Sequence, residues 1–176
     1  QPATSAPFMI SNSSSVIHFQ ARKVGNLQSA DPASACILVR NCARVTLDID
    51  ECFGGDDPIP LWVDGGYVTG RIGNMIASLG PCIFGGGINP TLVNLTFDSA
   101  WASNNICVNW APANGLASRL ILNGREMGGS EIPVEAQGST LWMTGGHVEI
   151  NASIVRPLGS ATFYNSIFQQ DGGELH

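Results

Sequence analysis

A short unit of two apolar strands recurs along this chain, and this repeat restricts the possible folds more than any other feature. The clearest copy spans residues 36–50, where two strands flank a tight corner at Asn41. In its second strand Val45, Leu47 and Ile49 alternate with polar residues, a period of two that is typical of a half-buried strand. The fold must therefore place many short, similar strands in equivalent environments.

Later copies keep the same order of apolar strand, short corner and apolar strand. Their first strands begin at Leu61, Cys82, Cys107 and Leu141, and weaker copies begin at Phe8 and Ala161. The spacing between copies centres in the low twenties of residues, and the variation falls in the long connections rather than at the corner. A constant corner with variable connections is typical of a solenoid, in which each repeat stacks on the one before.

The connections are rich in Gly, Pro and Asn, and none has the period of an amphipathic helix. This pattern argues against βαβ and leucine-rich-repeat folds and predicts an all-β chain folded as a parallel β-helix. An antiparallel sandwich is the main alternative, because it also uses short strands with turns every 8–12 residues or so. The β-helix is preferred because residue types recur in register, which a sandwich does not require.

Composition and charge limit the partners that this chain can have. Only 12% of the residues are charged, the net charge is −6, and Lys23 is the single lysine. Nucleic acids and anionic membranes both require basic patches, so neither is expected as a partner. No apolar run reaches 18 residues and no signal peptide is recognised, so we expect no membrane insertion.

The 176 residues are enough for one domain with a sizeable core. We expect a single domain over residues 1–176, with an arm at 1–7, about six to seven rungs over 8–171, and a tail at 172–176. The widest loop of this layout spans residues 123–140.

The five cysteines have no metal-ligand spacing, and no metal or other cofactor is expected. Cys36, Cys82 and Cys107 each begin the first strand of a copy, so stacking predicts one column that also contains Leu61 and Leu141. Buried cysteine behaves as a small hydrophobic residue, and buried, reduced thiols are the preferred interpretation. Disulfides are the alternative, although an odd number of cysteines leaves one thiol over.

With its Asn or Gly-Gly corners, apolar columns and stacked cysteines, the chain resembles a right-handed parallel β-helix of the pectin-lyase-like kind. It is most similar to the tailspike, or receptor-binding, proteins of bacteriophages, over roughly residues 8–171. The resemblance implies a side-by-side homotrimer, a location in the virion tail or outside the cell, and recognition of a host surface polysaccharide. It carries no catalytic motif, because Asp56-Asp57 lacks the other signatures of polygalacturonases and the pectate-lyase signatures are missing.

Aligning the second strands predicts which charges meet on neighbouring rungs. The alignment sets Val45, Val68, Val93, Leu120 and Val148 equal. Neighbours in such a column are about 4.8 Å apart, and opposite charges on adjacent strands attract. The alignment therefore predicts structural ion pairs between Asp48 and Arg71, between Asp98 and Arg125, and between Arg22 and Asp50.

The first strands carry apolar residues at positions that the same alignment places outward. These are Ile37, Trp62, Ile83, Val108 and Trp142. A soluble monomer rarely exposes such a stripe, so we expect a subunit interface that includes Trp62 and Trp142. The alternative is a sugar-binding platform, because the Trp rings can stack on pyranose faces.

Three functions follow as alternatives. The first is a tailspike-like segment that takes part in binding surface polysaccharide, and the second is a purely structural trimerisation segment. The third is a polysaccharide-degrading enzyme, a glycoside hydrolase or lyase with its own carboxylate site. Hydrolysis needs two carboxylates roughly 5–9.5 Å apart, and Glu126, Glu131 and Glu135 are the first candidates because they share the widest loop.

Overall fold

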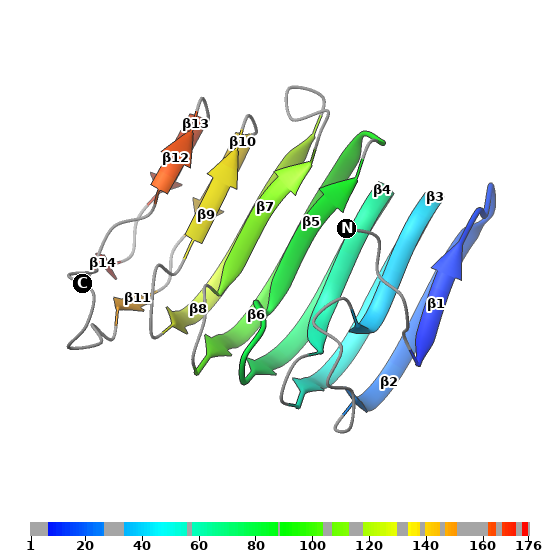
Figure 1. The fold of residues 1–176 in the computed structure, drawn as a ribbon, viewed down its shortest axis with the longest axis horizontal. Helices are drawn as coiled ribbons and strands as arrows, with labels where there is room; N and C mark the ends of the chain where they lie inside the picture. The colour runs from blue at the N-terminus through cyan, green and yellow to red at the C-terminus, as the bar shows by residue number, and fades with distance from the viewer. Residues whose placement is uncertain are drawn as a thin grey trace.

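The chain is an all-β solenoid of parallel strands (Figure 1). The computed structural model describes residues 7–26, 34–55, 58–87, 89–103, 107–112, 118–129, 134–137, 140–144, 147–150, 162–164, 167–171 and 174–175. The strands are β1 (Phe8–Ser11), β2 (Val16–Asn26), β3 (Ala35–Gly54), β4 (Ile59–Ala77), β5 (Ile83–Gly87), β6 (Thr91–Ala102), β7 (Val108–Pro112), β8 (Arg119–Gly129), β9 (Val134–Gln137), β10 (Thr140–Thr144), β11 (His147–Ile150), β12 (Thr162–Tyr164), β13 (Ile167–Asp171) and β14 (Glu174–Leu175).

All strand pairings within these ranges are parallel, and they build a β-solenoid of about four turns. The parallel, all-β prediction is therefore confirmed over this part of the chain, and the antiparallel sandwich is wrong. In the same ranges, no helix is long and apolar enough to cross a membrane.

Each rung contributes to three stacks of strands rather than two. The first stack contains β1, the beginnings of β3 and β4, and then β5, β7, β9 and β12. The second contains the beginning of β2, the middle of β3 and β4, and then β6, β8, β10 and β13. The third contains the ends of β2, β3, β4, β6 and β8, followed by β11 and β14. This third stack lies where the sequence pattern predicted loops.

The predicted register of the second stack is confirmed for four rungs and wrong for the fifth. Val45 lies opposite Val68, then Val93, then Leu120, as expected. The next residue in the column is Leu141, whereas Val148 lies opposite Met127 in the third stack. The first strand of that rung is β9, which occupies part of the supposed loop 123–140.

The core fills the inside of the solenoid with residues from all three stacks. In the first stack Ile37, Leu61, Ile83 and Val108 lie opposite one another and are fully buried in the core. The predicted outward stripe is therefore wrong at Ile37, Ile83 and Val108. Cys36, Cys82 and Cys107 are also buried in the core, as predicted, but Leu61 is paired with Ile37 rather than with Cys36. Adjacent residues Cys36 and Ile37 are both buried in this core, so the inside–outside alternation is not strict at the beginning of β3.

The corner predicted at Asn41 is confirmed by its backbone conformation. Asn41 has φ 48°, Asn12 on the preceding rung has φ 52°, and Gly65 on the following rung has φ 90°. The Asn41 side-chain amide donates a hydrogen bond to Asn12 Oδ1 at 3.1 Å. Asparagine and glycine tolerate this left-handed conformation better than other residues, which explains their recurrence at the corner.

The buried thiols make stability sensitive to alkaline pH. A hydrogen bond with Cys36, followed by burial, raises the pKa of Cys52 well above its ordinary value of 9.0. Burial, followed by a hydrogen bond with Cys107, raises the pKa of Cys82 in the same direction.

We expect these two thiols to leave the free energy of unfolding unchanged near pH 7 and to lower it progressively as the pH rises through 9. Unfolded thiols ionise there while the folded ones stay protonated, so each shifted thiol costs up to about 1.4 kcal/mol per pH unit. Urea titrations between pH 7 and pH 10.5 measure the slope. The Cys52→Ala/Cys82→Ala variant should show a flatter profile, and an unchanged slope would contradict the assignment to these thiols.

Candidate functional site

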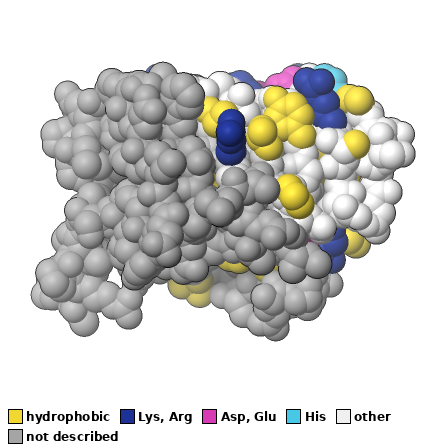
Figure 2. All heavy atoms as spheres, turned by 90° about the horizontal axis from the view of Figure 1, so that it is seen from above, with side chains coloured by type: hydrophobic (Ala, Val, Ile, Leu, Met, Phe, Trp, Pro, Cys, Tyr) yellow, Lys and Arg dark blue, Asp and Glu magenta, His cyan; other side chains and the backbone are white. Residues whose placement is uncertain are grey.

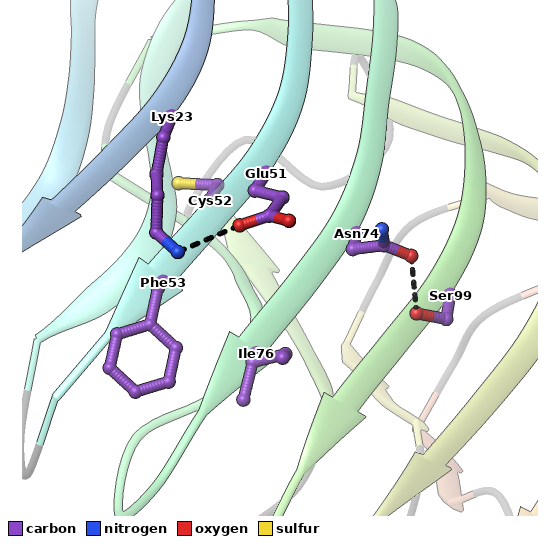
Figure 3. Close-up of a pocket in the computed structure, with 7 residues that line it drawn as sticks. All are labelled: Lys23, Glu51, Cys52, Phe53, Asn74, Ile76 and Ser99. Atoms are coloured by element: carbon purple, nitrogen blue, oxygen red, sulfur yellow. Dashed lines mark hydrogen bonds and ion pairs between the residues drawn. The ribbon is translucent and has the colours of Figure 1, made fainter.

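A groove crosses the outer face of the third stack, built from two rows of side chains in register (Figure 3). The polar row contains Lys23, Glu51, Asn74 and Ser99, one residue from each of β2, β3, β4 and β6. The apolar row contains Phe53, Ile76 and Trp101, each two residues further along its strand. Residues two apart in a strand face the same side, so the two rows run next to each other across the strands.

Hydrogen bonds between neighbouring rungs order the polar row. Lys23 Nζ lies 2.8 Å from Glu51 Oε2, with side chains that are 69% and 50% exposed. The Ser99 hydroxyl donates to Asn74 Oδ1 at 2.9 Å. The Asn74 amide N–H groups therefore remain as donors facing the same side as the Glu51 carboxylate. The row offers both donors and acceptors to a ligand that lies across it.

The apolar row leaves hydrophobic surface open to solvent. Ile76 is 41% exposed, and Phe53 and Trp101 are partly exposed. The Trp101 ring extends over the next rung, where it occupies the space that a Cβ of Gly128 would need. Glycine at position 128 thus allows the indole to lie along the surface of the solenoid.

A hollow of about 410 Å³ lies between the two rows, and Trp101 continues the apolar row one rung past the lining of this hollow. Its lining residues are Lys23, Glu51, Cys52, Phe53, Asn74, Ile76 and Ser99. In Figure 3 the Lys23–Glu51 and Asn74–Ser99 pairs lie toward one side of the hollow, and Phe53 and Ile76 lie toward the other. A site with an apolar wall and a few ordered polar groups is typical of ligand-binding pockets.

The carboxylates proposed for catalysis do not share a loop. Glu126 lies in β8, where its backbone is the register partner of Ser99. Glu135 lies in β9, opposite Asn109 in the first stack. Glu131 lies outside the described residues. The backbones of Glu51 and Glu126 are three rungs apart, roughly 14 Å at the usual strand spacing.

The two tryptophans proposed as one stripe lie in different stacks. Trp62 in β4 is 4% exposed and belongs to a small apolar cluster separate from the main core. Its ring meets the Phe84 ring edge to face at 4.6 Å, and Leu38 lies opposite it on the preceding rung. Trp142 lies in β10, opposite Ile121 in the second stack. A continuous stripe through Trp62 and Trp142 is therefore wrong.

The acidic and basic side chains of the second stack pair differently from the prediction. Arg71 lies opposite Asp48 but forms ion pairs with Asp50 at 3.2 Å and with Asp98 at 2.8 Å. Gly73 stands between Asp50 and Asp98 in their column, and the Arg71 guanidinium fills the space above it. These two carboxylates, Asp98 more than Asp50, raise the pKa of Arg71.

The other two predicted pairs, Asp98 with Arg125 and Arg22 with Asp50, lie opposite each other as predicted, but neither forms an ion pair among the described residues. Asp48 accepts a hydrogen bond from Gln20 Nε2 at 3.0 Å, and Asp98 pairs with Arg71 rather than with Arg125. Arg22 lines a shallow hollow together with Gln20, Asp48 and Asp50.

The residues of the apolar row were missed because the third stack was not predicted. The sequence does carry a signal for them: Phe53, Ile76 and Trp101 each lie eight positions after the aligned Val45, Val68 and Val93. Extending the register beyond the second strand would have brought them together.

The architecture places the chain in the class of parallel β-solenoid proteins. No protein-family model, no curated protein and no solved structure matches the chain. Across the described ranges, no group of three or more His, Cys, Asp or Glu side chains is arranged to hold a metal ion.

Proposed function

We propose that this chain is a segment of an adhesive, right-handed β-helix of the tailspike kind that binds a surface polysaccharide along the third stack. The observation that supports this proposal is the pair of in-register rows, one polar and one apolar, on neighbouring rungs. The rungs of β3, β4 and β6 repeat a polar and an apolar position at a step of about 4.8 Å along the solenoid axis. A polymer of similar units can use such a repeating surface several times.

The chemistry of the two rows suits a sugar chain. A pyranose ring has an apolar face of C–H groups and an edge of hydroxyl groups. In this proposal the apolar face of the sugar packs against Phe53, Ile76 and Trp101. Its hydroxyl groups exchange hydrogen bonds with Asn74 and the Glu51 carboxylate. Aromatic rings supply a large contact area with few rotatable bonds, so little conformational entropy is lost on binding.

The charges around the groove favour an uncharged polysaccharide over an acidic one. The Lys23 ammonium group is already paired with Glu51, and the chain as a whole has a net charge of −6. Figure 2 shows one face of the solenoid, on which the visible Lys and Arg side chains lie apart from one another. A polyanion would therefore meet an unfavourable potential without a cluster of basic residues to compensate for it.

The proposed assembly is a side-by-side homotrimer of about six to seven rungs per chain, located in a virion tail or outside the cell. It is supported by the resemblance to tailspikes rather than by an exposed tryptophan stripe. Light scattering at high protein concentration tests it, and a monomeric mass would contradict it.

Binding to a panel of neutral and acidic surface polysaccharides tests the proposed function. We expect Trp101→Ala to weaken binding of the neutral polysaccharide at least tenfold, which corresponds to about 1.4 kcal/mol. The matched control is Met9→Ala, which truncates a side chain that is 59% exposed on the first stack, away from the groove. The proposal fails if no polysaccharide binds or if Trp101→Ala and Met9→Ala bind equally well.

Cleavage of the bound polysaccharide is the alternative, with Glu126, Glu131 and Glu135 as the candidate carboxylates. Its supporting observation is the backbone register of Glu126 opposite Ser99, which belongs to the polar row. An assay for oligosaccharide release, repeated with Glu126→Gln, Glu131→Gln and Glu135→Gln, distinguishes an enzyme from a binding segment. Release that persists in all three variants would exclude these carboxylates as catalytic residues.

A further inference from the structure

Four of the five cysteines lie inside the solenoid as two neighbouring pairs. All five are reduced in this structure, and all are at most 4% exposed. All five cysteines belong to the main core, and four of them lie close together in pairs. We infer that Cys82–Cys107 and Cys36–Cys52 are two disulfide sites, which the chain closes when it folds in the presence of an oxidant.

The Cys82–Cys107 pair lies on adjacent rungs at the same position. The Cys82 N–H donates to the Cys107 carbonyl oxygen at 2.8 Å, so the two backbones are direct neighbours. Their side chains point the same way, because Cys82 Sγ contacts the Met75 carbonyl oxygen at 3.7 Å and Cys107 Sγ contacts that of Ala100 at 3.4 Å. Met75 and Ala100 are themselves register partners. Neighbouring strands are about 4.8 Å apart, which lies within the range of Cα separations that disulfides span.

The Cys36–Cys52 pair connects the beginning of β3 with its end. Cys36 Sγ contacts the carbonyl oxygen of Phe53, the residue after Cys52, at 3.2 Å. Cys52 Sγ contacts the carbonyl oxygen of Pro60 at 3.4 Å. Pro60 lies between the Ile59 and Leu61 partners of Ala35 and Ile37, and so stacks directly on Cys36. Each sulfur thus reaches the immediate surroundings of the other, and the raised pKa of Cys52 has its main cause in this neighbour.

Cys42 is the fifth cysteine, and it belongs to neither of the two inferred disulfide sites. It lies at the corner after the first strand, where its thiol contacts the carbonyl oxygens of Ile10 at 3.3 Å and Arg40 at 3.2 Å. Two pairs and one separate thiol account for all five cysteines.

The oxidant that we name is glutathione disulfide. One cysteine thiolate attacks a glutathione sulfur, releases one glutathione thiolate and forms a mixed disulfide. The partner cysteine then attacks that mixed disulfide and releases the second glutathione, which gives one protein disulfide and two glutathione thiols. Two thiols lose two electrons and two protons in total, and glutathione disulfide accepts them. Because the native thiols are buried away from glutathione, the reaction requires an open or partly folded chain.

Mapping the crosslinks by mass spectrometry tests the inference. The protein is held in urea just below its unfolding midpoint with glutathione disulfide, diluted, alkylated and digested without reduction. We expect peptides joined through Cys82–Cys107 and through Cys36–Cys52, alkylated Cys42, and a higher urea midpoint for the oxidised protein. Without urea, the same incubation should give no crosslink.

A matched variant separates specific pairing from random oxidation. Cys107→Ala should lose the first crosslink, leave Cys82 alkylated and keep the Cys36–Cys52 crosslink. The wild-type map is independent of whether this variant folds. Absence of both crosslinks, or crosslinks that include Cys42 as often as the other cysteines, would overturn the inference.

Discussion

Replacing Trp110 with alanine should lower the free energy of unfolding by about 3–5 kcal/mol. Trp110 in β7 is fully buried, and its ring lies over Gly85 on the preceding rung, where no side chain competes for the space. The substitution leaves a cavity between rungs that the regular strand spacing prevents from collapsing. Equilibrium unfolding in urea, followed by circular dichroism, measures the loss.

Trp110→Phe is the matched control for that prediction. The indole Nε1–H of Trp110 is buried without a hydrogen-bond partner among the described residues. A phenyl ring keeps most of the packing and removes this unpaired donor, so we expect a cost of only about 1 kcal/mol. If Trp110→Phe is as destabilising as Trp110→Ala, the indole N–H contributes a hydrogen bond and the packing explanation is wrong.

Gly66→Ala should destabilise the solenoid by roughly 3 kcal/mol. Gly66 has φ 114°, a conformation that residues with a Cβ rarely adopt. It also lies opposite Cys42 on the preceding rung, and an added Cβ would collide with the Cys42 carbonyl group. The backbone cannot move away without breaking the ladder between β3 and β4, so both effects add to the cost.

Gly25→Ala provides the same chemical change with a much milder contact and without a positive φ. A Cβ at Gly25 would come no closer than 3.3 Å to the Phe53 carbonyl oxygen. We expect this variant to change the unfolding free energy by less than about 1 kcal/mol. Urea midpoints of the two variants are compared directly, and equal losses would show that strain and collision at Gly66 are not the cause.

Trp110 and Gly66 both depend on the regular distance between neighbouring rungs of the solenoid. Trp110 fills the interior between rungs, and Gly66 allows the close approach of backbones at the corner. The groove on the third stack depends on the same spacing, because its two rows exist only while β3, β4 and β6 stay in register. Destabilised variants are therefore unsuitable as probes of binding, and Trp101→Ala on the surface is the better choice.

The sequence by itself determined the solenoid and part of its register. The repeated apolar strands, the corner at Asn41 and the alignment of Val45, Val68, Val93 and Leu120 all agree with the structure. This information is local, because the period of two and the left-handed preference of asparagine act within a few residues. Because the same strand–corner–strand unit recurs along the chain, its copies are expected to occupy equivalent positions on successive rungs.

Only the tertiary structure decided which residues face outward in the first stack. It also revealed the third stack, which follows the second in each rung. A shift of one residue exchanges the two faces of a strand, and at the beginning of β3 the adjacent residues Cys36 and Ile37 are both buried in the core. Pairing by charge failed for a related reason: Arg71 reaches across Gly73 to Asp50 and Asp98 rather than to its direct neighbour Asp48. The groove depends on the third strand of each rung, and its residues meet only because consecutive rungs stack in register.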